Sequence, residues 1–245
     1  MIEIEQLTKY YGDKLAVNNL NLEIPAGQIF CFLGPNGAGK TTTIKIMTGL
    51  LRPSTGTVRI GGHDIQSDPT PAKQLMGYIP DMPYVYERFT CSEFFDFSGD
   101  IYNVPRALIK QRKEEYFELF GLIEYRSVLV KELSHGLRQR LIYATTFLHE
   151  PKVLFVDEPL IGLDPYTIRL IKDLLRERAR QGMTIFLTTH ILALAEDVGD
   201  RIGIIMQGNI CALGDLNSLL SEHDERKLED VFLKLTQSEY TQRGN

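Results

Sequence analysis

Two short segments carry residue types that could act together on a phosphate group. The first is GPNGAGKTTT, residues 34–43, which fits the pattern G-x-x-x-x-G-K-[ST] and follows an apolar stretch. Its glycines let the backbone curl so that successive N–H groups point at anionic oxygens. We expect Lys40 to reach the outer phosphates of a bound nucleotide and the Thr41 hydroxyl to ligate Mg²⁺. The residues predicted to bind the nucleotide here are Gly34, Pro35, Asn36, Gly37, Ala38, Gly39, Lys40, Thr41 and Thr42.

The second segment is VLFVDEP, residues 153–159, in which four apolar residues lead into two adjacent carboxylates. Ligands of parallel α/β sheets bind outside the carboxyl ends of the strands, which is where Asp157 falls. We expect Asp157 to hold Mg²⁺, directly or through water. Glu158 points elsewhere because neighbouring side chains alternate in direction, and it is predicted to accept a proton from the attacking water. The plainer interpretation is a strand followed by an acidic turn.

Two further positions are weaker candidates. His190 follows the apolar stretch TIFLTT, where its imidazole could hydrogen-bond the outermost phosphate and hold the attacking water in line with Glu158. A lone histidine is more often structural, and only its place at a strand end sets it apart. In LSHGLRQRL, residues 133–141, Ser134 is a plausible helix N-cap, and Gly136 follows it. A helix N-terminus attracts anions, but these residues by themselves favour an ordinary capped helix.

The segments between these residues predict alternating strands and helices. Residues 29–33 and 153–156 are almost wholly apolar, as in strands buried on both faces of a parallel sheet. In LAVNNLNLEI we expect a turn at the two asparagines. Apolar residues recur at helical spacing over residues 81–150, and helices are also expected from Tyr166 to Gln181 and from Leu192 to Val198. Such alternation favours a largely parallel sheet with helices on both faces.

Composition excludes several classes of protein. The chain of 245 residues has a formal net charge of −5, so we expect no nucleic-acid partner. The three cysteines are widely spaced and odd in number, which indicates neither a disulfide framework nor a zinc site and fits a reducing compartment. The longest apolar runs fall short of the roughly 18 residues of a membrane-spanning helix. If the protein acts at a membrane, a partner is expected to hold it there.

Taken in order, GPNGAGKTT, LSHGLRQRL, VLFVDEP, GLDP and TTH resemble the nucleotide-binding subunit of an ATP-binding cassette (ABC) transporter, from Leu7 to about Leu213. The resemblance implies an α/β fold of the P-loop NTPase type. Its sheet would be mostly parallel and flanked by helices, with an N-terminal antiparallel β part and an inserted helical subdomain. A single domain over 1–245 is expected, with 1–80 and 151–215 as catalytic core, 81–150 as helical subdomain and 216–245 as helical tail.

The resemblance also implies a site shared between two subunits. Two cassettes, identical or paralogous, would stack head to tail and bury two ATP molecules, each completed by Ser134 and Gly136 of the other subunit. Asp164 would reach across the interface between the two subunits. Tyr11 would stack on adenine, although an exposed loop tyrosine is the simpler interpretation. ATP would close this dimer, and hydrolysis by Glu158, His190 and Lys40 would open it.

This chain departs from the family pattern at two places. The usual LSGGQ is LSHGL here, which keeps Ser134 and Gly136. The glutamine that commonly follows GYIP is replaced by Asp81, a carboxylate able to ligate Mg²⁺ but unable to donate a hydrogen bond when ionised. An acidic residue here resembles the exporter-type (ABC-2-like) branch, whose membrane subunits are separate polypeptides.

The function expected from this resemblance is ATP hydrolysis that energises solute export through multi-span membrane subunits. The protein would then lie peripherally at the cytoplasmic face of the membrane. Its partner would dock near DMPYVYE, residues 81–87, where Met82, Tyr84 and Tyr86 are either exposed anchors or packed inside. Two alternatives stay open, a soluble ABC ATPase without a transport role and a module that senses ATP without hydrolysing it.

Overall fold

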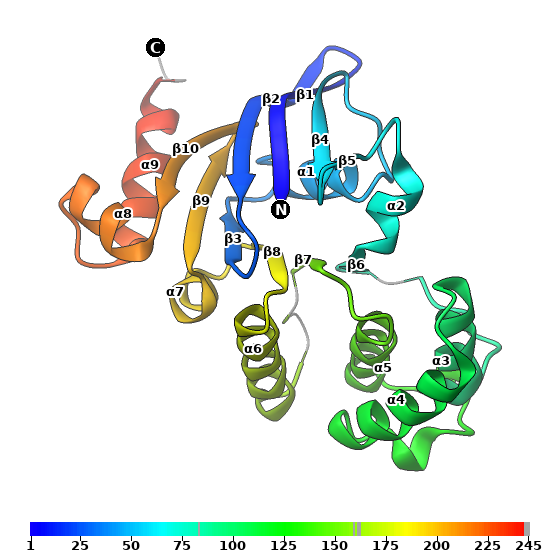
Figure 1. Ribbon diagram of the computed structural model, residues 1–245. Helices are drawn as coiled ribbons and strands as arrows, with labels where there is room; N and C mark the ends of the chain where they lie inside the picture. The colour runs from blue at the N-terminus through cyan, green and yellow to red at the C-terminus, as the bar shows by residue number, and fades with distance from the viewer. Residues whose placement is uncertain (83, 159, 161–162, 243–245) are drawn as a thin grey trace.

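The computed structural model of the chain describes residues 1–82, 84–158, 160 and 163–242. Within these residues the strands form one sheet of four and one of six (Figure 1). The strands are β1 (Ile2–Tyr11), β2 (Lys14–Ile24), β3 (Ile29–Leu33), β4 (Thr55–Ile60), β5 (His63–Asp64), β6 (Met76–Ile79), β7 (Val153–Asp157), β8 (Thr184–Thr189), β9 (Arg201–Met206) and β10 (Asn209–Gly214). The helices are α1 (Lys40–Met47), α2 (Pro69–Gln74), α3 (Cys91–Ile101), α4 (Arg106–Leu119), α5 (His135–Phe147), α6 (Pro165–Arg180), α7 (Leu192–Val198), α8 (Leu216–His223) and α9 (Leu228–Gln242).

The larger sheet positions the candidate residues. Its order is β10-β9-β3-β8-β7-β6, and all neighbours are parallel except β10, which runs antiparallel to β9. The smaller sheet, β2-β1-β4-β5, is antiparallel throughout. Parallel strands end at the same edge, so the residues that follow β3, β6, β7 and β8 are brought together there. The predicted α/β class, with a mostly parallel sheet and an N-terminal antiparallel part, is confirmed.

The apolar strands of the larger sheet are buried on both faces. On one face the rings of Phe30, Phe32 and Phe186 pack together, with centroids 5.3–6.1 Å apart, and join a core shared with α1 and the smaller sheet. On the other face, residues such as Cys31 and Leu187 belong to a core that includes side chains of α5, α6 and α7. Because side chains alternate along a strand, two buried faces require a continuous apolar run.

Helices α3, α4 and α5 lie together at one end of the molecule, as the sequence spacing over 81–150 predicts (Figure 1). Helix α3 begins with a capping box in which Thr90 Oγ1 accepts from the Glu93 N–H and Glu93 Oε2 accepts from the Thr90 N–H. Such a box satisfies two N–H groups that the first helical turn leaves without partners. The division of the chain at 80/81 and 150/151 into core and subdomain stays a prediction.

The turn expected within LAVNNLNLEI is wrong. Strand β2 runs through both asparagines, and Asn19 adopts a left-handed conformation with φ of 46°. Its pairing with β1 shifts register at this point, so one extra residue is absorbed as a β-bulge. Pairing with β1 on both sides of Asn19 outweighs the turn preference of asparagine. In the described residues no helix has the length and apolarity needed to cross a membrane.

Candidate functional site

The loop between β3 and α1 bounds a cleft of about 560 Å³ and contributes Asn36, Gly37 and Gly39 to its lining. Gly39 has φ of 114°, and a Cβ there would lie 2.6 Å from the Ala16 carbonyl oxygen. A Cβ on Gly34 would lie 2.4 Å from the Ile205 carbonyl oxygen. Both distances are too short for any side chain, so the curl of this loop requires glycine at these two positions.

Lys40, the first residue of α1, turns back into its own loop. Its Nζ donates to the carbonyl oxygens of Gly34 at 2.6 Å and Pro35 at 3.2 Å, and the residue is 6% exposed. Burial lowers the pKa of Lys40, whereas the nearby Glu158 and Asp157 carboxylates act in the opposite direction. The ammonium group is thus held inside the loop with acids nearby, poised for an anionic ligand.

Asp157 ends β7 beneath the floor of the cleft and is 3% exposed. The Thr188 hydroxyl on the neighbouring strand β8 donates a hydrogen bond to Asp157 Oδ1. Burial raises the pKa of Asp157, and hydrogen bonds from Thr188 and Thr41 counteract that rise. Thr41 lines the cleft above Asp157, and a hydroxyl and a carboxylate are oxygen donors of the type that Mg²⁺ prefers.

Glu158 directly follows β7 and adopts a left-handed backbone conformation, with φ of 51°. That conformation costs about 1–3 kcal/mol for a residue with a side chain, and such strain concentrates at functional sites. Its Oε1 lies 3.0 Å from His190 Nδ1 and 3.9 Å from Lys40 Nζ. Its Oε2 is buried and has no hydrogen-bond partner in the described part of the chain. This oxygen therefore has an unmet capacity to accept a hydrogen bond.

Three other predicted residues reach the same cleft from different elements. Asp81 follows β6 and His190 follows β8, the two strands that flank β7, so they line the cleft with Glu158. Tyr11, at the end of β1, closes another side and is about half exposed. An aromatic face and phosphate-binding groups in one cleft suit a nucleotide. The predicted residues that line the cleft are Tyr11, Asn36, Gly37, Gly39, Lys40, Thr41, Thr42, Asp81, Glu158 and His190.

Some predicted residues do not line the cleft. Gly34 and Asp157 are buried, and Pro35 and Ala38 line a neighbouring hollow. Ser134 and Gly136 lie at the start of α5, outside the cleft lining. Ser134 Oγ accepts from the Leu137 N–H at 3.3 Å, which is the ordinary N-cap contact. A Cβ on Gly136 would meet no atom of the described residues within 4 Å, so none of them crowds that position.

Asp164 has partners within its own chain. It caps α6 by accepting from the Thr167 N–H at 3.0 Å and from the Thr167 hydroxyl at 2.6 Å. It also pairs with Arg140 of α5, with Nη2 and Oδ2 3.0 Å apart. The hydrogen bonds from Thr167, together with Arg140, lower the pKa of Asp164. Its carboxylate therefore links the start of α6 to the helix that Ser134 caps.

Sequence reasoning overlooked two kinds of residue. Lys14 and Ala16 of β2 line the cleft beside Tyr11, and their place in the segment KYYGDKLAV could have suggested them. Thr188 contacts both Asp157 and Glu158, yet a threonine inside an apolar stretch is an ordinary strand residue. No sequence signal would have found that contact.

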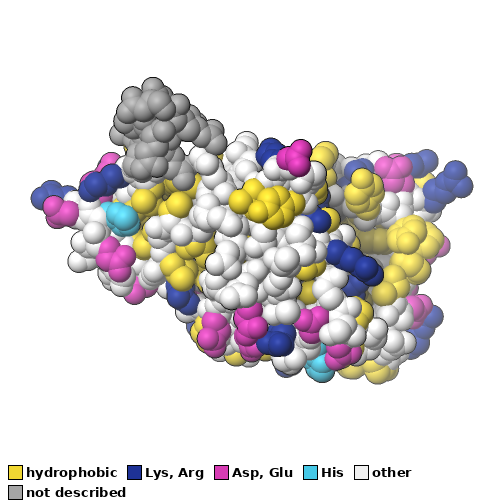
Figure 2. All heavy atoms as spheres, turned by 90° about the horizontal axis from the view of Figure 1, so that it is seen from above, with side chains coloured by type: hydrophobic (Ala, Val, Ile, Leu, Met, Phe, Trp, Pro, Cys, Tyr) yellow, Lys and Arg dark blue, Asp and Glu magenta, His cyan; other side chains and the backbone are white. Residues whose placement is uncertain are grey.

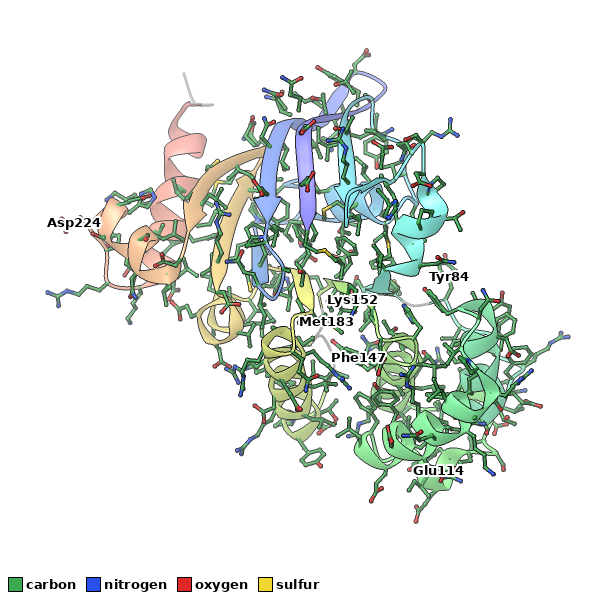
Figure 3. The ribbon with its side chains drawn as sticks, viewed as in Figure 1. Tyr84, Glu114, Phe147, Lys152, Met183 and Asp224 are labelled. Atoms are coloured by element: carbon green, nitrogen blue, oxygen red, sulfur yellow. The ribbon has the colours of Figure 1, made fainter. Side chains whose placement is uncertain are left out.

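A second cavity, of about 190 Å³, lies between α5 and α6, where Figure 3 labels Phe147, Lys152 and Met183. Lys152 precedes β7 and Met183 precedes β8, so this cavity lies at the amino ends of the strands. Ligands of open α/β sheets bind at the opposite, carboxyl ends. Since Glu158 and His190 also converge there, the cleft of about 560 Å³ is the candidate site.

An exposed apolar surface lies on the segment between β6 and α3. Met82 is 81% exposed and Tyr84 is fully exposed, so neither packs inside. Tyr86 is 57% exposed and its ring also packs on the start of the helical region, with its centroid 5.4 Å from that of Phe89 and 5.0 Å from that of Phe97. Figure 3 shows Tyr84 beside α3. In Figure 2, hydrophobic side chains gather at the end of the molecule where Figure 1 shows helices α2, α3, α4 and α5.

A model of the protein family described as "ABC transporter" matches residues 17–161. The chain belongs to the ABC transporter family. This ABC protein is 34% identical over 238 residues to the linearmycin resistance ATP-binding protein LnrL of Bacillus subtilis (strain 168), covering 97% of this chain and 75% of LnrL. It is 38% identical over 220 residues to the daunorubicin/doxorubicin resistance ATP-binding protein DrrA of Streptomyces peucetius, covering 90% of this chain and 67% of DrrA.

A solved structure titled as the ATP-binding subunit of an ABC transporter superposes on this ABC protein with a TM-score of 0.92 at 29% identity. The superposition covers 96% of this chain and 99% of that one. The predicted family, the P-loop NTPase fold and the identity as an ATP-binding, ATP-hydrolysing subunit of an ABC transporter are confirmed. The comparisons favour this function over a soluble ATPase without a transport role.

Proposed function

We propose that Glu158 is the general base with which this ABC subunit hydrolyses ATP in the cleft. The observation that carries the proposal is the buried Oε2 of Glu158, which lacks a hydrogen-bond partner in the described residues. The other oxygen is oriented by His190 at 3.0 Å. A carboxylate fixed in this way can accept a proton from water aligned with the outermost phosphate. His190 would help position that water, and Lys40 would compensate the negative charge that develops on the phosphate.

The other residues of the cleft would bind the remaining parts of the nucleotide. Tyr11 would stack on the adenine ring, and the backbone N–H groups of residues 34–42 would hold the phosphates beside the N-terminus of α1. Lys40 would exchange its contacts with the Gly34 and Pro35 carbonyls for contacts with phosphate oxygens. This exchange is inexpensive because the ammonium group is already partly desolvated.

The residues present fit a Mg²⁺ ion that is bound together with ATP. Thr41 provides a hydroxyl in the cleft lining, Asp157 provides a carboxylate at the end of β7, and Asp81 lines the same cleft. No cluster of three histidine, cysteine or acidic side chains in the described residues is arranged to hold a metal alone. That composition suits Mg²⁺, which keeps waters and takes phosphate oxygens as ligands. When bound, Mg²⁺ would supply positive charge to the β- and γ-phosphates.

A second cassette, identical or paralogous, would complete each site. Ser134 and Gly136 lie outside this chain's own cleft, and the space around Gly136 suits close approach of a phosphate from another subunit. Two copies facing each other about a two-fold axis would each offer these residues to the other's ATP. ATP would join the two subunits, and hydrolysis would let them separate, which is a population shift that a membrane partner can use.

We further propose that the subunit lies at the cytoplasmic face of the membrane and energises solute export through separate multi-span subunits. The names of LnrL and DrrA, which are resistance ATP-binding proteins, support an export role. The exposed Met82 and Tyr84, close to Asp81, are the proposed anchors for the membrane partner. Apolar and aromatic side chains of this kind often dominate the energy of an interface.

Mixing two inactive variants tests the shared site. Lys40→Ala damages the phosphate loop, whereas Gly136→Asp places a negative charge against the partner's ATP and should fold normally because that position is uncrowded. In a mixed dimer one site contains both changes and the other contains neither. We expect each variant alone to be inactive and an equal mixture to recover about a quarter of the wild-type ATPase rate, the statistical share of intact sites in a two-fold dimer.

The matched control mixes Lys40→Ala with the Lys40→Ala/Gly136→Asp double variant, because no intact site can form from that pair. Recovery in this control, or none in the first mixture while wild-type protein hydrolyses ATP, would contradict a site shared between subunits.

The Asp81→Gln variant distinguishes a role of Asp81 in binding Mg²⁺ from a role in coupling ATP hydrolysis to transport. Glutamine keeps an oxygen ligand and restores a hydrogen-bond donor. We expect the basal ATPase rate to change by less than about 10-fold, the smallest effect typical of disturbing a metal site. Stimulation of ATPase activity by solute, measured with the membrane subunit in vesicles, should fall more strongly. A collapse of the basal rate alone would identify Asp81 mainly as a metal ligand.

A further inference from the structure

Thr188 of β8 contacts both Asp157 and Glu158. It is fully buried and lies opposite Asp157 in the register of β7 and β8. Its hydroxyl donates to Asp157 Oδ1, and its carbonyl oxygen accepts from the Glu158 N–H at 3.1 Å. His190, which contacts Glu158 Oε1, follows two residues later on the same segment. One short stretch of β8 therefore holds the side chain of one acid and the backbone of the other.

The hydroxyl contact limits how the Asp157 carboxylate can rotate. With Oδ1 held by Thr188, rotation of the carboxylate about its Cβ–Cγ bond is restricted, and the direction of Oδ2 is restricted with it. A hydrogen bond to the ionised form also favours the charged carboxylate, which burial disfavours. Groups that orient a metal ligand in this way affect metal affinity although they never touch the metal.

The neighbouring threonines of β8 do not share this contact. Thr189 accepts from the Ile191 N–H at 3.0 Å and so belongs to the turn after the strand. Thr184, at the far end of β8, is equally buried and its hydroxyl contacts the Gly27 N–H and the Pro25 carbonyl oxygen, both at 3.3 Å. Thr184 therefore provides a buried, hydrogen-bonded threonine on the same strand without any contact to the acids.

We propose that Thr188 is a positioning residue whose hydroxyl aligns Asp157 for the metal-bound nucleotide. This inference rests on the proposed function of the cleft and adds a residue to it. If the hydroxyl merely satisfied a buried carboxylate, its loss would reduce stability alone. If it aligns the carboxylate, its loss removes the part of nucleotide affinity that depends on Mg²⁺.

The test measures ADP binding by the full-length protein, once with Mg²⁺ and once with EDTA, by isothermal titration calorimetry. The ratio of the two affinities is the metal-dependent increment. We expect Thr188→Val, which keeps the shape of the side chain but not the hydroxyl, to reduce this increment about 10- to 100-fold. Thr188→Ser keeps the hydroxyl and should retain most of the increment. In EDTA all variants should bind ADP as the wild type does.

Thr184→Val is the matched control, because it removes an equally buried hydroxyl at the opposite end of β8. It is expected to lower the midpoint of thermal unfolding while leaving the metal-dependent increment unchanged. If Thr188→Val does not fold, Thr188→Cys replaces it, since a thiol is a weaker donor of similar size and should give an intermediate increment.

Three results would overturn the proposal. They are an unchanged increment in Thr188→Val, an unchanged increment in Thr188→Cys where that variant is used, and an equal loss in Thr184→Val. If the wild-type protein still binds ADP more tightly with Mg²⁺ than with EDTA, these results exclude the role of Thr188 but not the proposed function of the cleft. A wild-type protein with no metal-dependent increment overturns the metal site and the role of Thr188 together.

Discussion

Glu158→Gln is expected to bind ATP as the wild type does and to hydrolyse it about 10²- to 10⁴-fold more slowly, the range for loss of a general base. The amide has nearly the shape of the carboxylate, so the contact with His190 at 3.0 Å and the packing around β7 should persist. It cannot take a proton from water, however. ATP that binds and is not cleaved should keep two subunits together, so a dimer should accumulate.

Two measurements check this result, phosphate release at saturating ATP and the molar mass of the protein with and without ATP. Glu177→Gln is a suitable control because Glu177 is exposed on α6 and its Oε1 accepts from the neighbouring Gln181 side chain, at 3.1 Å. That variant should behave as the wild type in both measurements. Full turnover by Glu158→Gln would exclude Glu158 as the base, whereas loss of ATP binding would indicate a structural role for its charge.

Lys40→Ala is expected to weaken ATP binding at least about 10- to 100-fold, because hydrogen bonds to charged groups contribute roughly 1.5–3 kcal/mol. Lys40 is 6% exposed, and its ammonium group is already held at the cleft by the Gly34 and Pro35 carbonyls. A nucleotide phosphate would therefore meet a positive charge that is already partly desolvated before binding. Alanine removes that charge and also the contacts that tie the loop to α1.

The affinity for ATP can be measured by equilibrium titration with a fluorescent analogue. Lys45→Ala is the matched control, since Lys45 is an exposed lysine on the same helix and does not line the cleft. It removes the same formal charge and should bind ATP nearly as the wild type does. Equal losses in both variants would point to net charge, and unchanged binding in Lys40→Ala would place the phosphates elsewhere.

Much of the fold follows from local patterns in the sequence. Apolar runs such as residues 29–33 and 153–156 specify buried strands because both faces of the sheet are covered. The turn expected at Asn18 and Asn19 is wrong for a related reason. Asparagine favours turns locally, but pairing of β2 with β1 on both sides of it is a long-range interaction that a local pattern does not contain.

The chain of amino acids by itself determined the phosphate loop and the two acids, because their chemistry depends on residue type and short spacing. Backbone N–H groups, one lysine and one hydroxyl must follow one another closely to surround a phosphate, and that requirement is visible within residues 34–43. The acids at 157 and 158 are equally local, since they occupy the end of one apolar strand.

The tertiary structure alone decided which distant residues meet those groups. The sheet order β8-β7-β6 brings His190 and Asp81 to line the cleft with Glu158, and the register of β7 and β8 sets Thr188 against Asp157. It also left Ser134 and Gly136 outside the cleft of their own chain. These placements depend on strand pairing and helix packing between segments far apart in sequence, which no spacing along the chain encodes.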